Sequence, residues 1–297
     1  MLKKFKEKIE SKRDSKNILW SFSVLIKDLL WSLYIFPRNV IIFLAIKNRI
    51  IPRKTNKRRI ELEITSFCNM NCINCNRSIR QARTDEYMSL NQIKKFVKES
   101  IELGYKWDNI NIMGGEPSLH PQIEQIIKEF KILKDYDPKI TINLVTNGFG
   151  KKVNEVISKL PSWIAINSTN KKSPVQFFAS YNDAPIDDKK FLHSKFDKGC
   201  EITENCGLGL TRYGYYVCGP GASVDRVFGF DLGIKKLSLL SDAELDKQRK
   251  IFCKYCGHYK YKNAADKKYW TTEEKISSSW EKAYKDYKNK KPALSLY

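Results

Sequence analysis

The sequence lacks the features that define several protein classes. Eight cysteines in 297 residues are too few for a small domain held together by disulfides. There is no internal repeat and no low-complexity tract. No cleavable signal peptide is visible, because the first 17 residues are charged and no small-residue cleavage site follows. We therefore expect a cytoplasmic protein, in whose reducing surroundings clustered cysteines more often bind metal than form disulfides.

Acidic residues are scarce, with 33 Asp and Glu against 54 Lys and Arg. Residues 1–59 hold sixteen basic and four acidic residues, so they contribute +12 of the net charge of +21. These basic residues flank an apolar stretch and are not spread over a groove with stacking aromatics, so we expect no nucleic-acid partner. The 42% of hydrophobic residues is enough for one sizeable core or two smaller ones and excludes a disordered chain.

The basic N-terminal segment contains two apolar stretches, 18–36 and 40–46. Lys27 and Asp28 interrupt the first stretch, and the second is too short to cross a hydrocarbon core of about 30 Å. We predict that residues 1–58 form an amphipathic helical segment on the anionic cytoplasmic face of a membrane. The alternatives are a helical hairpin packed on the main domain, a contact between protomers, or a membrane span.

Three cysteines follow a predicted strand, 59–65, whose residues alternate between apolar and polar. Cys68, Cys72 and Cys75 are separated by three and two residues. Three thiolates can hold three irons of a cubane and leave the fourth iron open to a ligand. A structural zinc site normally has four protein ligands, so this triad favours an iron–sulfur cluster.

Further motifs follow at the ends of further predicted strands. A helix is expected over 90–102, and the strand 110–113 ends in Gly114-Gly115-Glu116-Pro117. Thr146-Asn147-Gly148 follows the strand 140–145, and Ser168 follows the strand 163–167. In a barrel of parallel strands, chemistry gathers at the carboxyl ends of the strands, which is where these motifs fall.

Taken in order, these motifs resemble those of the radical S-adenosylmethionine (radical SAM) superfamily. The resemblance implies an α/β fold, with a partial, open TIM-type barrel over residues 59–199 and a [4Fe-4S] cluster held by Cys68, Cys72 and Cys75. The family usually has an aromatic residue directly before the third cysteine, whereas this chain has Asn74. The positions that the resemblance assigns to S-adenosylmethionine are Gly114, Gly115, Glu116, Pro117, Thr146, Asn147, Asn167 and Ser168.

The resemblance also implies an activity. One electron from a reductant such as flavodoxin or ferredoxin would cleave S-adenosylmethionine at the open iron. The resulting 5′-deoxyadenosyl radical would abstract hydrogen from an unactivated C–H bond of a small molecule, which the protein holds close and shields from water.

Five more cysteines surround a predicted hairpin at 208–218, namely Cys200, Cys206, Cys218, Cys253 and Cys256. Cys253 and Cys256 are expected at the start of a helix or in a knuckle. The arrangement resembles the twitch domain, a reduced form of the SPASM domain, which implies that residues 200–263 hold an auxiliary [4Fe-4S] cluster. Four cysteines suffice for such a cluster. We expect Cys206, Cys218, Cys253 and Cys256, with Cys200 as the alternative to Cys206.

Two alternatives concern this group. A zinc site could use Cys253, Cys256 and His258 with another cysteine. The thiol left over, Cys200 or Cys206, is either a buried thiol or the donor that returns a hydrogen atom to the substrate radical, as in radical epimerases.

Two weaker candidates lie between the motifs. His120 follows the Gly-Gly-Glu-Pro motif and either caps a loop or approaches the cofactor. Asp183, Asp187 and Asp188 form an acidic loop that either faces water or serves the substrate.

The sequence therefore predicts four parts, the last being a helix and tail over 264–297. The expected function is dehydrogenation or epimerisation of a sugar-type substrate, either free or lipid-linked. The alternatives are a radical SAM maturase of ribosomal peptides and a non-catalytic, membrane-associated iron–sulfur protein.

Overall fold

The structure is a computed structural model that describes residues 25–32, 34, 53–261 and 263–297. The chain divides into two compact units, Met1–Ile51 and Pro52–Tyr297. The sequence placed the first boundary after residue 58. Residues 53–58 belong to the larger unit instead. Arg53 N–H donates to Lys198 O at 2.9 Å, and Asn56 N–H donates to Thr203 O at 2.9 Å.

In the smaller unit, the described residues 25–32 and 34 are helical. Leu29, Leu30 and Trp31 are each about 60% exposed, at 60%, 61% and 63%. The remaining residues of the predicted amphipathic segment lie outside the described residues. Within the described part of the chain, no helix combines the length and apolar character that a membrane crossing requires.

The larger unit is built on one six-stranded sheet in the order β4-β3-β2-β1-β5-β6. All neighbouring strands are parallel except β5 and β6, which form an antiparallel hairpin. This confirms the predicted α/β fold, and the sheet is consistent with an open partial barrel. The strands are β1 (Arg59–Thr65), β2 (Asn109–Gly114), β3 (Thr141–Thr146), β4 (Ala165–Ser168), β5 (Leu208–Thr211) and β6 (Gly214–Tyr216).

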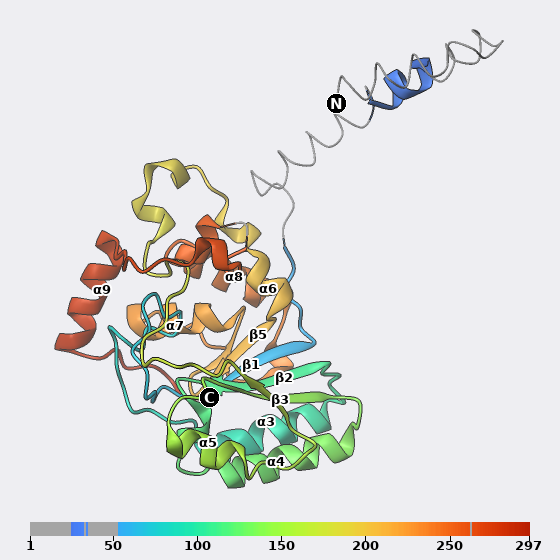
Figure 1. The fold of residues 1–297 in the computed structure, drawn as a ribbon, viewed down its shortest axis with the longest axis vertical. Helices are drawn as coiled ribbons and strands as arrows, with labels where there is room; N and C mark the ends of the chain where they lie inside the picture. The colour runs from blue at the N-terminus through green and yellow to red at the C-terminus, as the bar shows by residue number, and fades with distance from the viewer. Residues whose placement is uncertain (1–24, 33, 35–52, 262) are drawn as a thin grey trace. The chain divides into compact units, whose positions relative to one another are not determined.

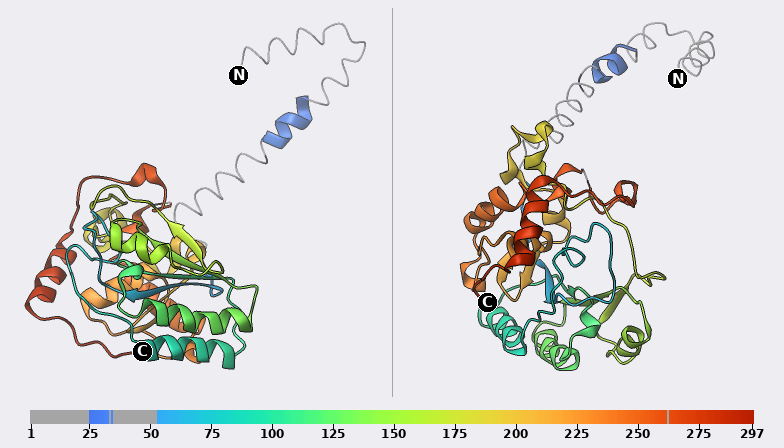
Figure 2. Two further views of the ribbon diagram at one scale, coloured as in Figure 1. Left: turned by 60° about the horizontal axis from the view of Figure 1, so that its bottom comes forward. Right: turned by 90° about the vertical axis from the view of Figure 1, so that its left-hand side faces the viewer.

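Three helices lie in a row along one face of the sheet, as Figures 1 and 2 show: α3 (Leu90–Glu102), α4 (Ile123–Tyr136) and α5 (Lys151–Ile157). Helix α3 begins where the sequence predicts, because Ser89 and Gln92 form a capping box. Ile60 and Leu62 of β1 are fully buried in the same core as Phe96 and Phe130 of these helices.

The opposite face of the central strands is polar. Glu61, Asn111 and Asn143 stand in register across β1, β2 and β3. Asn143 Nδ2–H donates to Asn111 Oδ1 at 3.0 Å. Since successive residues of a strand point to opposite faces, the alternation in β1 gives this barrel interior its carboxylates.

The C-terminal half shares this sheet and this core. Its helices are α6 (Glu201–Asn205), α7 (Gly219–Phe228), α8 (Asp242–Phe252) and α9 (Ser278–Asn289). The predicted boundaries at 199 and 263 stay predictions, since β5 pairs with β1 in one sheet. Short 3-10 helices occupy Pro117–Leu119, Pro185–Asp187, Lys189–Phe191, Phe196–Lys198, Leu237–Leu239, Gly257–Lys260 and Lys267–Tyr269.

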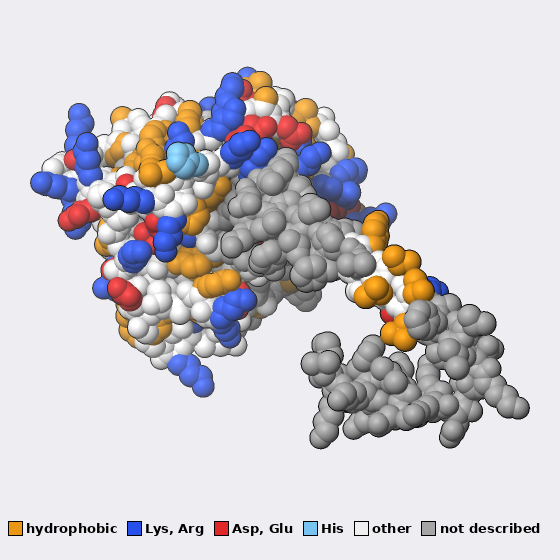
Figure 3. All heavy atoms as spheres, turned by 90° about the horizontal axis from the view of Figure 1, so that it is seen from above, with side chains coloured by type: hydrophobic (Ala, Val, Ile, Leu, Met, Phe, Trp, Pro, Cys, Tyr) orange, Lys and Arg blue, Asp and Glu red, His pale blue; other side chains and the backbone are white. Residues whose placement is uncertain are grey.

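Of the two alternatives for Cys253 and Cys256, a helix starting at Cys253 is wrong: Cys253 caps the end of α8, where its N–H donates to Arg249 O and Ile251 O, and Cys256 precedes the 3-10 helix Gly257–Lys260. Within the predicted helix and tail of 264–297, helix α9 begins at Ser278, and Thr271 before it pairs with Phe178 in an antiparallel bridge. On the face in Figure 3, the described Lys and Arg side chains are scattered among acidic and apolar ones.

Candidate active site

One cavity of about 390 Å³ collects residues from the carboxyl ends of four parallel strands. The cysteine loop follows β1, Gly114 and Gly115 end β2, Thr146 and Asn147 end β3, and Thr169 and Lys171 follow β4. The positions of the motifs at the ends of predicted parallel strands predict that these residues lie together. The volume lies within the usual range of small-molecule sites, about 300–1,000 Å³.

Cys68, Cys72 and Cys75 all line this cavity, and each sulfur accepts a backbone hydrogen bond. Met70 N–H donates to Cys68 Sγ at 3.4 Å. Burial raises the pKa of the Cys68 thiol to about 12 and also raises the pKa values of the other two thiols. Backbone N–H groups that point at sulfur favour its charged form, which is the form that binds metal.

The end of β2 lies directly against the cysteine loop. A Cβ on Gly115 would stand 2.1 Å from Phe67 O, so this approach requires glycine. Gly115 N–H donates to Thr65 O at 2.7 Å, and Glu116 N–H donates to Phe67 O at 2.8 Å. The two glycines therefore place a bare main chain at the wall of the cavity beside the first cysteine.

The Glu116 side chain is fully buried and does not line the cavity. Its Oε1 accepts from Ser118 N at 3.1 Å, Ser118 Oγ at 2.7 Å and Thr146 Oγ1 at 2.7 Å. Its Oε2 accepts from Asn147 N at 2.8 Å. Within this structure the carboxylate therefore ties the end of β2 to the end of β3, and Pro117, at the start of a 3-10 helix, is buried beside it.

Asn147 connects β3 to the cysteine loop. Its Nδ2 donates to Asn69 Oδ1 at 2.9 Å and lies 4.0 Å from Cys68 Sγ. Of the two residues expected at the end of β4, Asn167 is exposed and Ser168 bonds Asn170 Oδ1 at 2.8 Å; neither lines the cavity. The next residues, Thr169 and Lys171, line it instead. These two residues were not predicted from the sequence, although they lie only two and four residues beyond the predicted strand end at 167.

The second group of cysteines lies near the amino end of β5. Burial, followed by the nearby thiols of Cys200, Cys218 and Cys253, raises the pKa of Cys256. Cys218 N-caps α7, and its Sγ accepts from Gly221 N–H at 3.4 Å. Cys256 therefore has three neighbouring thiols, which are those of Cys200, Cys218 and Cys253.

Cys206 has different surroundings. It lines the cavity together with Ile202, Arg77 and His258. The nearby carboxylate of Glu61 is the largest cause that raises the pKa of Cys206, ahead of burial. A neighbouring negative charge and burial both favour the neutral S–H form of a thiol.

Helix α6 separates the two competing cysteines, because Cys200 is its N-cap and Cys206 its C-cap. Six residues of α-helix advance about 9 Å along the axis and turn through about 240° beyond one full turn. The two sulfurs are therefore carried to different sides of this short helix.

Arg77 and His258 form the polar end of the cavity. Arg77 Nη2 lies 2.7 Å from Glu61 Oε2, while its Nε and Nη1 have no hydrogen-bond partner among the described residues. Burial and the Arg77 charge lower the pKa of His258 to about 4, so this ring is neutral. Its Nδ1 also lacks a hydrogen-bond partner among the described residues.

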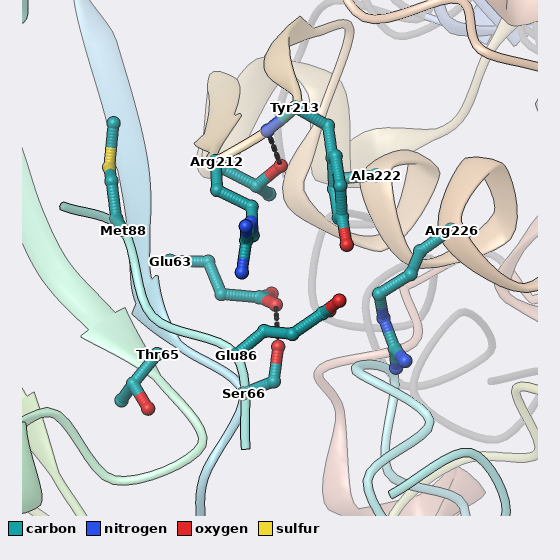
Figure 4. A pocket seen from close by; sticks show the side chains of 10 residues that line it. Glu63, Thr65, Ser66, Glu86, Met88, Arg212, Tyr213, Ala222 and Arg226 are labelled. Atoms are coloured by element: carbon teal, nitrogen blue, oxygen red, sulfur yellow. Dashed lines mark hydrogen bonds between the residues drawn. The ribbon is translucent and has the colours of Figure 1, made fainter. Parts of the chain in front are cut away.

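A separate small pocket holds a cluster of charges (Figure 4). Glu63 and Ser66 face Glu86, with Arg212 and Arg226 nearby. Ser66 Oγ–H donates to Glu63 Oε1 at 3.4 Å. The space of about 10 Å³ is close to the minimum for one water molecule, so it is too small for a cofactor.

The weaker sequence candidates lie outside the cavity. His120 Nε2 is 3.1 Å from Met88 O and its Nδ1 accepts from Gln122 N–H at 3.0 Å, as expected for a residue that orders a loop. Asp183 is buried and paired with Lys260 at 2.8 Å. Asp187 accepts from Ser279 N–H at the start of α9, and Asp188 accepts from Lys190 N–H.

Among the described residues, no group of three or more His, Cys, Asp or Glu is arranged to hold a single metal ion. Thiolates around one zinc ion stand about 3.8 Å apart, since each Zn–S bond is about 2.3 Å in a tetrahedron. Thiolates of a cubane bind different irons and so stand farther apart.

Known proteins resemble the chain in this same region. Residues 62–167 match the family model of the Radical SAM superfamily. Probable GTP 3′,8-cyclases are similar over short segments. The protein of Methanococcus maripaludis (strain C5) is 37% identical over 91 residues, and that of Methanocaldococcus jannaschii is 35% identical over 91 residues. Each match covers 31% of this chain and 28% of the relative, so the chain spans little more than a quarter of those proteins' length.

Among solved structures, the crystal structure of BtrN in complex with AdoMet and 2-DOIA shows 13% sequence identity and a TM-score of 0.40. It covers 72% of this chain and 94% of the BtrN chain. The family match therefore assigns residues 62–167, which include the cysteine loop and the ends of β2 and β3, to the Radical SAM superfamily.

The cofactors of this family are a [4Fe-4S] cluster and S-adenosylmethionine, and the residues present fit them. Three thiols share one cavity, and backbone N–H groups point at each sulfur. Gly114 and Gly115 line the cavity, and their lack of side chains lets the end of β2 lie this close to the backbone of the cysteine loop. Cys68, Cys72 and Cys75 would hold the cluster.

Replacing Glu116 with Gln should destabilise the protein by about 1–3 kcal/mol. One carboxylate oxygen would become an NH₂ group, which cannot accept the hydrogen bonds that Asn147, or Ser118 and Thr146, now donate to it. Glu124→Gln, at an exposed position in the first turn of α4, is the control. Urea denaturation measures the free energy of unfolding. Equal stability of the two variants would contradict the role given to Glu116.

Proposed function

We propose that this protein is a radical SAM enzyme that inverts a carbon centre of a small, hydroxylated, sugar-type substrate. The observation that carries this proposal is the position of Cys206 on the wall of the cavity that the cluster cysteines line, beside the carboxylate of Glu61. When bound, the cluster and S-adenosylmethionine supply a 5′-deoxyadenosyl radical that removes a hydrogen atom from the substrate.

Cys206 would return the hydrogen atom on the opposite face of the substrate radical. The S–H bond breaks, a C–H bond forms, and a thiyl radical remains on Sγ. One electron from a flavodoxin- or ferredoxin-type reductant and one proton restore the thiol. The substrate is thus neither oxidised nor reduced overall, and one S-adenosylmethionine and two electrons are consumed in each turnover.

The polar end of the cavity supports a hydroxylated substrate. Arg77 Nε and Nη1 and His258 Nδ1 are buried groups that can hydrogen-bond hydroxyls. The charge of Arg77 is already balanced by Glu61 and Glu63, at 2.7 and 3.6 Å. This balance favours a neutral polyol over a strongly anionic ligand. We do not propose GTP as the substrate, since the match to the probable GTP 3′,8-cyclase covers only 28% of that protein's length.

A second candidate function is dehydrogenation, and a different observation favours it. The neighbouring thiols of Cys200, Cys218, Cys253 and Cys256 would hold an auxiliary [4Fe-4S] cluster. Such a cluster can accept the electron of a substrate radical, while a hydroxyl proton leaves to a base, so that an alcohol becomes a ketone. In this version Cys206 has no part in the reaction.

A third part of the proposal concerns the N-terminal unit. The exposed side chains of Leu29, Leu30 and Trp31 and the basic residues around them support binding to an anionic membrane surface. A substrate carried on a lipid would then be presented at that surface.

The ligands of the auxiliary cluster are tested by iron content after anaerobic reconstitution. Wild type should carry about eight irons, and the Cys68/Cys72/Cys75→Ala variant about four, since each cubane holds four. Cys200→Ala should lose or weaken the auxiliary cluster, whereas Cys206→Ala should keep about eight irons. The opposite result for these two single variants would make Cys206 the ligand and remove it as hydrogen donor.

The role of Cys206 is tested by turnover in D₂O with a panel of free, nucleotide-linked and polyprenyl-linked sugars. A compound that stimulates 5′-deoxyadenosine formation should be recovered with one deuterium at an inverted carbon. Cys206→Ala should still form 5′-deoxyadenosine but incorporate no deuterium. Ile202→Val, another change in the cavity wall, should still incorporate it.

Other outcomes separate the candidates. A product two mass units lighter, formed equally by Cys206→Ala, would establish dehydrogenation and refute inversion. Failure of the fully loaded wild type to form any 5′-deoxyadenosine would indicate a non-catalytic iron–sulfur protein.

Membrane binding is tested by sedimentation with vesicles. The full chain should sediment with phosphatidylserine-containing vesicles and much less with neutral phosphatidylcholine vesicles. A chain that begins at Pro52 keeps the larger unit whole and should stay in the supernatant. Equal sedimentation of both chains would rule out the N-terminal unit as the membrane contact.

A further inference from the structure

The residue before the third cysteine, Asn74, holds together two distant segments of the chain. It is fully buried, and its φ of 58° lies in the left-handed region, which Asn tolerates better than most residues. Its Nδ2 donates to Phe178 O at 3.2 Å and to Glu273 O at 3.1 Å. One amide group therefore fixes the cysteine loop to two segments that lie 104 and 199 residues further along the chain.

Backbone pairing strengthens the same assembly. Ile73 pairs with Phe177 in a parallel bridge, and Phe178 pairs with Thr271 in an antiparallel bridge. Ile73 N–H donates to Gln176 O at 2.8 Å. The segments around Phe178 and Thr271 therefore lie side by side and continue outward from the cysteine loop.

These segments bring two aromatic rings to the cavity. Phe178 and Trp270 both line it, with ring centroids 5.1 Å apart in an edge-to-face arrangement. Ala264 and Ala265 line the same region and take little space. The indole Nε1–H of Trp270 is buried and has no hydrogen-bond partner among the described residues.

We propose that Phe178 and Trp270 bind the adenine of S-adenosylmethionine. A purine offers a flat π-face for stacking and ring nitrogens that can accept a hydrogen bond from the indole N–H. The sugar ring of the substrate proposed above has no such face. The methionine end of the cofactor belongs at the three cysteines, and Asn74 joins the third of them directly to the aromatic segments. The adenine can therefore reach these rings while the methionine end stays at the cluster.

Asn74 is a positioning residue in this arrangement. An aromatic side chain at this position would have to adopt a left-handed backbone inside a fully buried site. It would also leave the carbonyl groups of Phe178 and Glu273 without the amide that now bonds them. The chain thus places its aromatic groups on other segments and uses position 74 to hold them.

The test is equilibrium dialysis with the anaerobically reconstituted full chain. The ligands are S-adenosylmethionine, 5′-deoxyadenosine and L-methionine, and the variants are Phe178→Leu, Trp270→Leu and Trp270→Phe. Phe178→Leu and Trp270→Leu should each weaken S-adenosylmethionine and 5′-deoxyadenosine binding about tenfold, since base–aromatic stacking is worth about 1–3 kcal/mol. Trp270→Phe keeps an aromatic ring but loses the N–H and part of the stacking area, so its loss should be about threefold. L-Methionine binding should not change in any variant.

Tyr136→Leu, at an exposed ring on α4 outside the cavity, is the matched control and should bind all three ligands normally. Iron content and thermal unfolding verify that each variant is loaded and folded. Asn74→Ala should weaken the two adenine-containing ligands although both rings remain.

Two results would overturn the inference. One is unchanged affinity for S-adenosylmethionine and 5′-deoxyadenosine in folded Trp270→Phe and Trp270→Leu. The other is an equal loss for L-methionine, which would mean that the substitutions disturb the cysteine loop and not an adenine site. Because no substrate enters these measurements, failure of the proposed inversion reaction would leave their outcome unaffected.

Discussion

The buried ion pair between Glu61 and Arg77 is the contact on which the candidate site depends. It joins β1 to the chain just after the third cysteine, and its side chains are only 11% and 5% exposed. Removing one partner of such a pair leaves an uncompensated buried charge and is costly. The pair also affects its surroundings, since Glu61 raises the pKa of the Cys206 thiol and Arg77 lines the cavity. A Cβ on Gly219 would stand 2.2 Å from Arg77 Nη1 and 2.4 Å from Glu61 Oε2, so a larger residue at the start of α7 would displace the pair.

The elements around the first cluster were predictable because their signals are local. The alternation in 59–65 predicts β1, and the capping residues Ser89 and Gln92 predict the start of α3. The cysteine triad and the glycines of β2 follow their strands directly, and parallel pairing brings strand ends to one edge. The position of Glu116 after β2 could be predicted from the motif. Its hydrogen bonds with Thr146 and Asn147 at the end of β3 depend on tertiary packing, which no local sequence pattern reveals.

The rest of the site could not be predicted, because it depends on contacts between distant segments. Phe178 and Trp270 carry no motif, and the amide of Asn74 brings them together across the chain. β4 ends at Ser168, and the cavity is lined by Thr169 and Lys171, one and three residues beyond it, in place of Asn167 and Ser168. The sequence spacing also could not decide between Cys200 and Cys206, which both precede the hairpin.

The choice between these two thiols follows from the local environment of each sulfur. Cys218 and Cys256 accept backbone N–H groups and stand near Cys200, which suits thiolates that bind iron. The carboxylate of Glu61 lies near Cys206 instead and favours the S–H form of its thiol. Cys200 and Cys206 stand at opposite ends of helix α6, as its N-cap and C-cap. In the proposed reaction, Cys206 at the cavity wall would return a hydrogen atom, and an electron and a proton would then restore its thiol.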